Sequence, residues 1–163
     1  AHTNFDQVND GTADVLAQLL ELQDTMPVVP THEGLGYGRV GDLPSPRTLD
    51  RLLATIQTQL NPPRLIYSPS ANLQQLVERV AVLGGSGASF LSAVAQTGAQ
   101  AYLTSDCKFH QFQEDRDRNL ILIDAGHYAT ERPACARLVE KFEQQGVIWT
   151  QLSTADEDFR QFW

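Results

Sequence analysis

Apolar residues repeat at helical spacing in two stretches of the first half of the chain. Between residues 12 and 23 they recur every three or four positions, which predicts a helix with Thr12 as its N-cap. The same spacing over residues 49–60 predicts a second helix, which a double proline ends. Between these helices, residues 27–32 have an extended pattern. Four glycines and a proline within residues 33–44 predict an irregular loop or a bulged edge strand.

Short apolar strands alternate with helices in the second half of the chain. Strand patterns occupy residues 64–68, 77–83, 101–104, 120–124 and 146–152, and helical patterns occupy residues 86–96, 109–118 and the stretch around Cys135, Leu138, Val139 and Phe142. This alternation predicts an α/β fold in which helices cover a mixed sheet. The length of 163 residues favours a single domain over residues 1–163. Because the chain starts without methionine, we interpret it as processed material or as part of a longer protein.

Composition and charge exclude several classes of protein. Hydrophobic residues make up 42% of the chain without an uncharged apolar run of about 18 residues or a signal-peptide pattern, so we expect a cytoplasmic protein with no membrane span. The net charge of −8 makes nucleic acid an unlikely partner, since phosphate binding needs clustered basic residues. Two cysteines without C-x-x-C spacing indicate neither a disulfide scaffold nor a zinc knuckle. We interpret Cys135 as a small buried hydrophobic residue.

Polar residues gather where three of the predicted strands end, at residues 84–87, 104–110 and 124–131. Ligands of α/β sheets bind beyond the carboxyl ends of the strands. His127 and Glu131 are four residues apart, so an imidazole and a carboxylate can converge on one point across a helical turn. Pro133 predicts that the regular helix begins near that residue and that residues 127–131 form a leading turn. A surface ion pair or a capping cluster would also explain this pair.

Other polar residues at these ends have two interpretations each. Asp124 either caps the turn after its strand or orients His127. The loop with Ser86 between glycines either exposes backbone N–H groups to an anion or allows a tight turn. His110 either supplies positive charge nearby or is simply solvated. At the start of the chain, His2 and Asp6 are four residues apart. They can join the His127 cluster only if the fold brings the first residues to this edge.

Five blocks in order carry a resemblance to a known family. They are "AHTNFD", "GLGYGRVGDL", "VAVLGGSG", "TSDCKFH" and "LIDAGHYATERP". Together they resemble the GTP cyclohydrolase 1 type 2 homologues, also called the Nif-three family. The resemblance implies an α/β fold, two metal ions per complete site and a ring-shaped hexamer. It makes Asp6, His127 and Glu131 metal ligands and brings His2 close to the metals.

The chain also departs from the family pattern. Family members begin with a further N-terminal segment that contains a His-His pair, and this sequence has no adjacent histidines. The resemblance therefore implies the C-terminal portion of a longer protein, with part of the ligand set. Ser105 stands where the family has glycine, which we expect to tighten that turn or to change its anion contacts.

These features lead to one main functional hypothesis and two others. The main hypothesis is a homo-oligomeric, metal-dependent hydrolase of a nucleotide or related small molecule. Its divalent ion would be Zn, Fe, Mn or Mg, because imidazole and carboxylate ligands suit all four. The second hypothesis is a non-catalytic, metal-stabilised scaffold or regulatory binding protein. The third is a plain α/β domain whose polar residues only cap turns.

Overall fold

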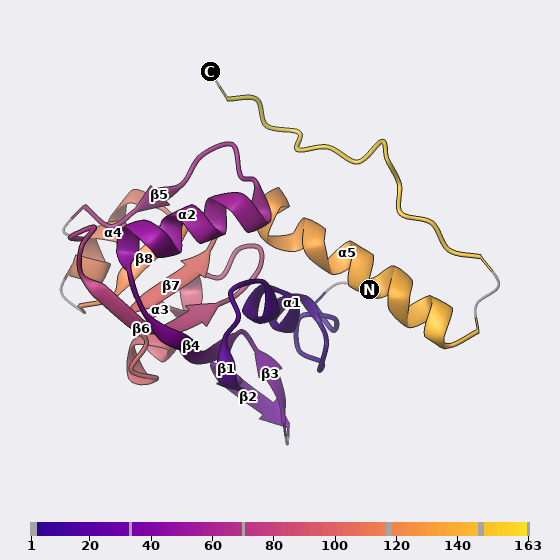
Figure 1. Ribbon diagram of the computed structural model, residues 1–163, viewed down its shortest axis with the longest axis horizontal. Coiled ribbons are helices and arrows are strands. Elements are labelled where there is room, and N and C mark those ends of the chain that lie inside the picture. The colour runs from indigo at the N-terminus through magenta and orange to yellow at the C-terminus, as the bar shows by residue number, and fades with distance from the viewer. Residues whose placement is uncertain (1–2, 33, 70, 117–118, 147–148, 163) are drawn as a thin grey trace.

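The protein folds around a six-stranded mixed sheet, shown in Figure 1. The computed structural model describes residues 3–32, 34–69, 71–116, 119–146 and 149–162. The strands are β1 (Gln23–Met26), β2 (Val29–His32), β3 (Leu35–Tyr37), β4 (Arg39–Thr48), β5 (Ile66–Tyr67), β6 (Leu76–Val82), β7 (Ala101–Thr104) and β8 (Ile121–Asp124). The helices are α1 (Thr12–Leu19), α2 (Leu49–Leu60), η1 (Ala88–Phe90), α3 (Leu91–Gln96), α4 (Phe109–Arg116) and α5 (His127–Gln144).

The order of the strands confirms the mixed sheet. It runs β1-β4-β6-β7-β8-β5, while β2 and β3 form a separate hairpin. Strands β6, β7 and β8 are parallel neighbours, and β4 and β5 pair antiparallel to β6 and β8. The carboxyl ends of the three parallel strands therefore meet at one edge of the sheet.

Helices cover both faces of the sheet, as the pattern predicts. One apolar cluster packs α1, α2 and the first turns of α5 against the strands. The other packs α3 and the residue before the β2–β3 hairpin against the opposite face. No helix of the described residues is long and apolar enough to cross a lipid bilayer.

The helix predictions for the first half are confirmed with one difference at α1. Helix α2 has the predicted bounds, with Thr48 accepting from the backbone N–H of Arg51 at 3.4 Å. The predicted N-cap at Thr12 is wrong, because Gly11 is the N-cap of α1 and Thr12 is its first helical residue. The helix ends early because Glu21 adopts a left-handed φ of 62°, which turns the chain toward β1.

The prediction of a loop or edge strand at residues 33–44 is wrong for β4. This strand lies inside the sheet, between β1 and β6. Its glycine at residue 41 allows that position, because an added Cβ would lie 2.6 Å from the carbonyl oxygen of Gln23. The bulge is real, since the register against β6 shifts between Asp42 and Arg47.

The predicted final strand at residues 146–152 is also wrong where the structure describes it. Residues 149–152 belong to no strand, and residues 147–148 lie outside the described residues. Helix α5 carries the chain beyond the sheet, so residues 149–152 reach no sheet edge (Figure 1). Trp149 accordingly remains 76% exposed.

Candidate metal centre

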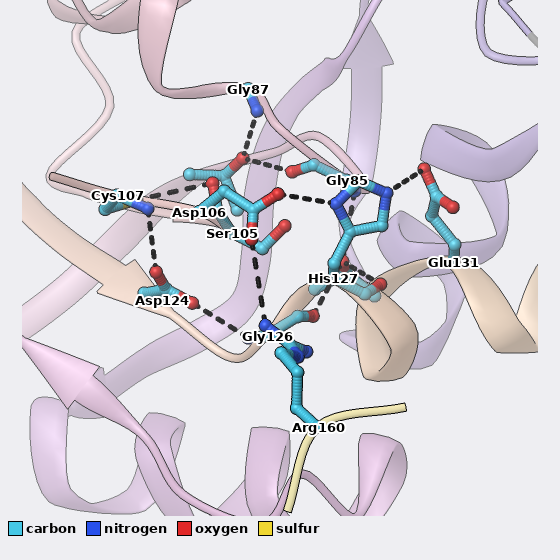
Figure 2. A network of polar contacts seen from close by, with 12 residues as sticks. Gly85, Gly87, Ser105, Asp106, Cys107, Asp124, Gly126, His127, Glu131 and Arg160 are labelled. Carbon is cyan, nitrogen blue, oxygen red and sulfur yellow. Dashed lines mark hydrogen bonds and ion pairs between the residues drawn. The ribbon is translucent and has the colours of Figure 1, made fainter. Parts of the chain in front are cut away.

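The polar strand ends come together as the sequence predicts, and Figure 2 shows them from close by. The loop after β6 contributes Gly85, the turn after β7 contributes Asp106, and the turn after β8 leads into His127. All three follow parallel strands, whose carboxyl ends lie at one edge.

Helix α5 begins at His127, so the predicted start near Pro133 is wrong. Gly126 precedes the helix with a φ of 84°, and its carbonyl oxygen accepts from the backbone N–H of Thr130 at 3.2 Å. The helix continues through Pro133 although proline cannot donate a backbone hydrogen bond. The first turns therefore have helical spacing, and His127 Nε2 lies 3.2 Å from Glu131 Oε1.

Asp106 holds the other ring nitrogen of His127. Its Oδ2 lies 2.6 Å from His127 Nδ1, and since a carboxylate only accepts, Nδ1 carries the proton in this contact. Metal-binding histidines commonly have such a carboxylate on the nitrogen away from the metal. Sequence reasoning identified the block around Asp106 but missed the residue itself. The available signal was an acid two residues after a buried parallel strand, where it adopts a φ of 54° that aspartate tolerates.

The surroundings raise the pKa of His127 above its ordinary value of 6.5. Partial burial lowers this pKa, but the hydrogen bond that His127 donates to Asp106 and the negative charges of Glu131 and Asp106 together outweigh burial. The pair with Asp106 therefore stabilises the folded protein while the imidazole is protonated. That contribution is present below pH 6.5 and is lost as the pH rises through the raised pKa.

Replacing Asp106 by asparagine should lower the pKa of His127, because the charged acceptor is removed. Titration of the imidazole resonances by NMR in metal-free protein measures this directly. The wild type should also lose its stability advantage over Asp106→Asn as the pH rises through the folded pKa. The resonances of His110, on the exposed surface of α4, serve as the internal control. An unchanged pKa of His127 in the variant would contradict the assigned contact.

Because Gly85 has no side chain, it provides the space in which the side chains of His127 and Glu131 approach each other. It has a φ of 66°, and an added Cβ would collide with Glu131 Oε1 and lie 3.3 Å from His127 Nε2. Two hydrogen bonds hold this loop in place. Gly85 N–H donates to Thr130 Oγ1, and Gly87 N–H donates to Thr104 Oγ1, both at 3.0 Å. Because these two N–H groups already have partners, the loop geometry supports the tight-turn interpretation over an anion cradle.

The position of Asp6 shows whether the start of the chain reaches the edge of the sheet near His127. Asp6 lines a hollow of about 150 Å³ together with Phe5, Thr12 and Glu131, so the N-terminal residues do reach α5. His2 lies outside the described residues. Among the residues that are described, no three His, Cys, Asp or Glu side chains gather closely enough to hold a metal ion. Asp6 therefore flanks the His127–Glu131 pair without joining it.

Comparison with known proteins identifies the family. The profile of the Duf34/NIF3 (NGG1p interacting factor 3) family matches residues 1–156. The chain belongs to this family. A GTP cyclohydrolase 1 type 2 homolog of Nostoc sp. (strain PCC 7120 / SAG 25.82 / UTEX 2576) is 72% identical over 162 residues, which cover 99% of this chain and 62% of the relative. A homolog of the same name from Streptomyces coelicolor is 39% identical, over 83% of this chain and 49% of its own length.

Solved structures agree on the fold. A Bacillus cereus protein related to NIF3 superimposes with a TM-score of 0.88 at 19% identity, covering 99% of this chain and 72% of that protein. This chain spans about three-fifths of the length of its Nostoc relative.

The remaining predicted residues of this NIF3 chain take different places. Asp124 is buried and accepts from the backbone N–H groups of Cys107 and Gly126, each at 2.8 Å, so it caps both turns. Through these two backbone contacts, Asp124 holds the turns that carry Asp106 and His127. Ser86 is exposed at the tip of its loop, and His110 is exposed on α4. Neither has a described contact with His127.

The structure also places Cys135 and Ser105, for which the sequence makes predictions. Cys135 is exposed, so its predicted burial is wrong: it lies one turn beyond Glu131 on the face that lines the pocket, while Ala134 faces the core. Ser105 is fully buried, and its N–H donates to the carbonyl oxygen of Gly85 at 3.1 Å. Its hydroxyl has no hydrogen-bond partner within the described part of the chain. The backbone bond to Gly85 agrees with the expected tight turn, and the expectation about anion contacts stays a prediction.

Proposed function

We propose that this chain carries part of a dinuclear metal site of a metal-dependent hydrolase. The observation that carries the proposal is the approach of His127 Nε2 to Glu131 Oε1 at 3.2 Å, with Nδ1 held by Asp106. This arrangement fits a metal ion, because with Nδ1 protonated and anchored on Asp106, Nε2 and Glu131 Oε1 would be two donor atoms for one ion. Gly85 leaves the space beside both donor atoms.

Three residues of this chain would serve as ligands. His127 and Glu131 supply a nitrogen and an oxygen donor, and Asp6 supplies a carboxylate from the neighbouring hollow. Further ligands would come from another segment or another copy, which agrees with a homo-oligomer, and with a hexamer by resemblance. Zn, Fe, Mn and Mg all accept such donors. The chemistry that a bound divalent ion supplies is Lewis acidity, which lowers the pKa of water toward neutrality.

The substrate we propose is a nucleotide or a related small molecule. Its support is the name of the relatives, GTP cyclohydrolase 1 type 2 homolog. The pocket beside His127 has a volume of about 470 Å³ and is lined by both basic and acidic side chains.

The alternative is a metal-stabilised scaffold or regulatory binding protein without turnover. It is favoured by the absence of a gathered three-ligand cluster among the described residues. Hydrolysis of GTP above the rate of a metal-depleted control would exclude this alternative. Stabilisation by added Zn or Mn without any hydrolysis would support it.

The test of metal binding compares Glu131→Ala with the wild type by inductively coupled plasma mass spectrometry. Loss of a ligand should lower metal affinity by about 100-fold or more, since loss of an outer-shell partner already costs 10–100-fold. Glu143→Ala is the matched control, because Glu143 is exposed near the end of the same helix. It should keep the metal content of the wild type. Full metal content in Glu131→Ala would overturn the proposal.

A further inference from the structure

The last part of the described chain crosses the pocket that contains His127 and Glu131. One wall of this pocket comes from the first turns of α5 and the other from residues 156–160. Residues 153–160, called the strap from here on, contain no helix or strand. In Figure 1 the C-terminal chain runs back along α5 in yellow.

Two residues of α5 hold the strap. Arg132 Nε forms an ion pair with Asp156 Oδ2 at 2.9 Å, and the hydroxyl of Tyr128 donates to the backbone oxygen of Asp156 at 3.0 Å. Arg132 also reaches the carbonyl oxygen of Ser153 at 3.5 Å. On the helix that carries His127 and Glu131, the guanidinium of Arg132 thus holds the carboxylate of Asp156, and the phenol of Tyr128 holds the backbone oxygen of the same residue.

At its other end the strap reaches the partner of His127. Arg160 is held by Asp158, with Nε and one terminal nitrogen about 3 Å from its carboxylate oxygens. The other terminal nitrogen of Arg160 lies 3.7 Å from Asp106 Oδ1 (Figure 2). The strap therefore spans the pocket from Arg132 to Asp106.

The contacts that hold the strap are weak ones. The side chain of Asp156 is 41% exposed, and Phe159 is 94% exposed, so little apolar surface is buried. The Nε–H of Arg132 also donates to the hydroxyl of Tyr128 at 3.2 Å, so its ion pair with Asp156 at 2.9 Å competes with a second partner. A guanidinium offers five donors in a fork that matches the paired oxygens of a phosphate or carboxylate. A ligand that uses this fork bidentately would bind better than Asp156 does.

We propose that Arg132 and Tyr128 form an anion-binding site for the phosphate or carboxylate group of a substrate, and that Asp156 of the strap occupies this site until the ligand displaces it. The inference rests on the proposed function only in treating the adjoining pocket as the substrate site.

The negative charge of the strap explains why the strap must leave the pocket when an anion binds. Between residues 153 and 160 it carries three carboxylates and one guanidinium. Asp106 and Glu131 add negative charge to the same pocket. An anion that entered beneath the strap would be repelled by these carboxylates, whereas displacement removes most of that repulsion. Binding of the anion and opening of the strap are therefore one coupled step.

Calorimetric titration of the metal-free chain with inorganic pyrophosphate and with malonate tests the site. Arg132→Gln should weaken binding of the preferred probe by about tenfold or more, as expected for lost hydrogen bonds to a charged group. Asp156→Asn should tighten binding by about three- to five-fold, which is the effect of one exposed ion pair. Glu157→Gln is the matched control: it removes the same charge from the same strap but has no described contact with Arg132 or Tyr128. It should change affinity by less than about two-fold.

Trypsin measures displacement of the strap independently of affinity. Pyrophosphate should accelerate cleavage after Arg160 in the wild type and leave it unchanged in Arg132→Gln, as followed by mass spectrometry. Tighter binding of pyrophosphate than of malonate would assign the site to phosphate, and the reverse order to carboxylate.

Three results would overturn the inference. They are no binding of either probe, equal affinity of Arg132→Gln and the wild type, or no difference between Asp156→Asn and Glu157→Gln. Because the titrations use metal-free protein, their outcome is separate from the metal test. Metal retained in Glu131→Ala would remove the proposed hydrolase site and leave the anion site standing.

Discussion

Gly85→Ala should lower the metal affinity of this NIF3 chain by about 10–100-fold, the range for a disturbed outer-shell partner. The new methyl group would collide with Glu131 Oε1 and crowd His127 Nε2. Glu131 has a flexible side chain, so it can swing away from the loop, which ends its convergence with His127. The folded protein should survive this change, because the cost is confined to the left-handed backbone at residue 85 and is about 1–2 kcal/mol.

Gly98→Ala separates this effect from backbone strain. Gly98 has a φ of 76°, similar to that of Gly85, but an added Cβ would meet no atom within 4 Å. The two variants should therefore lose similar stability in urea unfolding, and only Gly85→Ala should lose metal in mass spectrometry. Equal metal content in both variants would show that Gly85 has no role in placing Glu131.

Asp14→Ala should lower the free energy of unfolding by about 3–5 kcal/mol, the usual cost of removing one partner of a buried ion pair. Arg39 is only 3% exposed, and its Nε and a terminal nitrogen donate to the two Asp14 oxygens at 2.6 and 3.0 Å. The remaining terminal nitrogen donates to the carbonyl oxygens of Gly36 and Gly38. This guanidinium joins α1, the β2–β3 hairpin and β4, and without Asp14 its charge is left in a buried position.

Asp42→Ala is the matched control for that prediction. Asp42 accepts from Arg79 at 2.8 and 2.9 Å, but its side chain is 47% exposed. An exposed pair contributes about 0–1 kcal/mol, so this variant should unfold near the wild-type urea concentration. Total stabilities of domains are about 5–15 kcal/mol, so the loss in Asp14→Ala would be a large part of the whole. Similar midpoints for both variants would contradict the role given to Arg39.

The elements that follow local pattern were predictable from the sequence. Helix α2 and strand β7 have the predicted bounds, because apolar spacing, the proline pair after α2 and the glycine shortly before β7 act within a few residues. Strand β4 was not predictable in this way. Its one glycine and two prolines are typical of loops. Gly41 fits an interior strand because the backbone of residue 23 lies so close that a side chain would not fit, and the prolines lie where the register against β6 shifts. The strand predicted at residues 146–152 is absent at residues 149–152 for the opposite reason, since an apolar pattern forms no strand without a sheet edge to pair with.

The sequence by itself determined the family, the α/β class and the edge of the sheet where the polar residues gather. These properties depend on the order of motifs and on the alternation of strands and helices, which the chain carries in one dimension. It also gave the His127–Glu131 spacing, which follows from the period of a helix. Only the tertiary structure decided which neighbours these residues meet. Asp106, Gly85 and the strap lie far from His127 or Glu131 along the chain, and parallel strands and a returning C-terminal segment bring them together. Contacts across such distances depend on packing, which no local pattern contains.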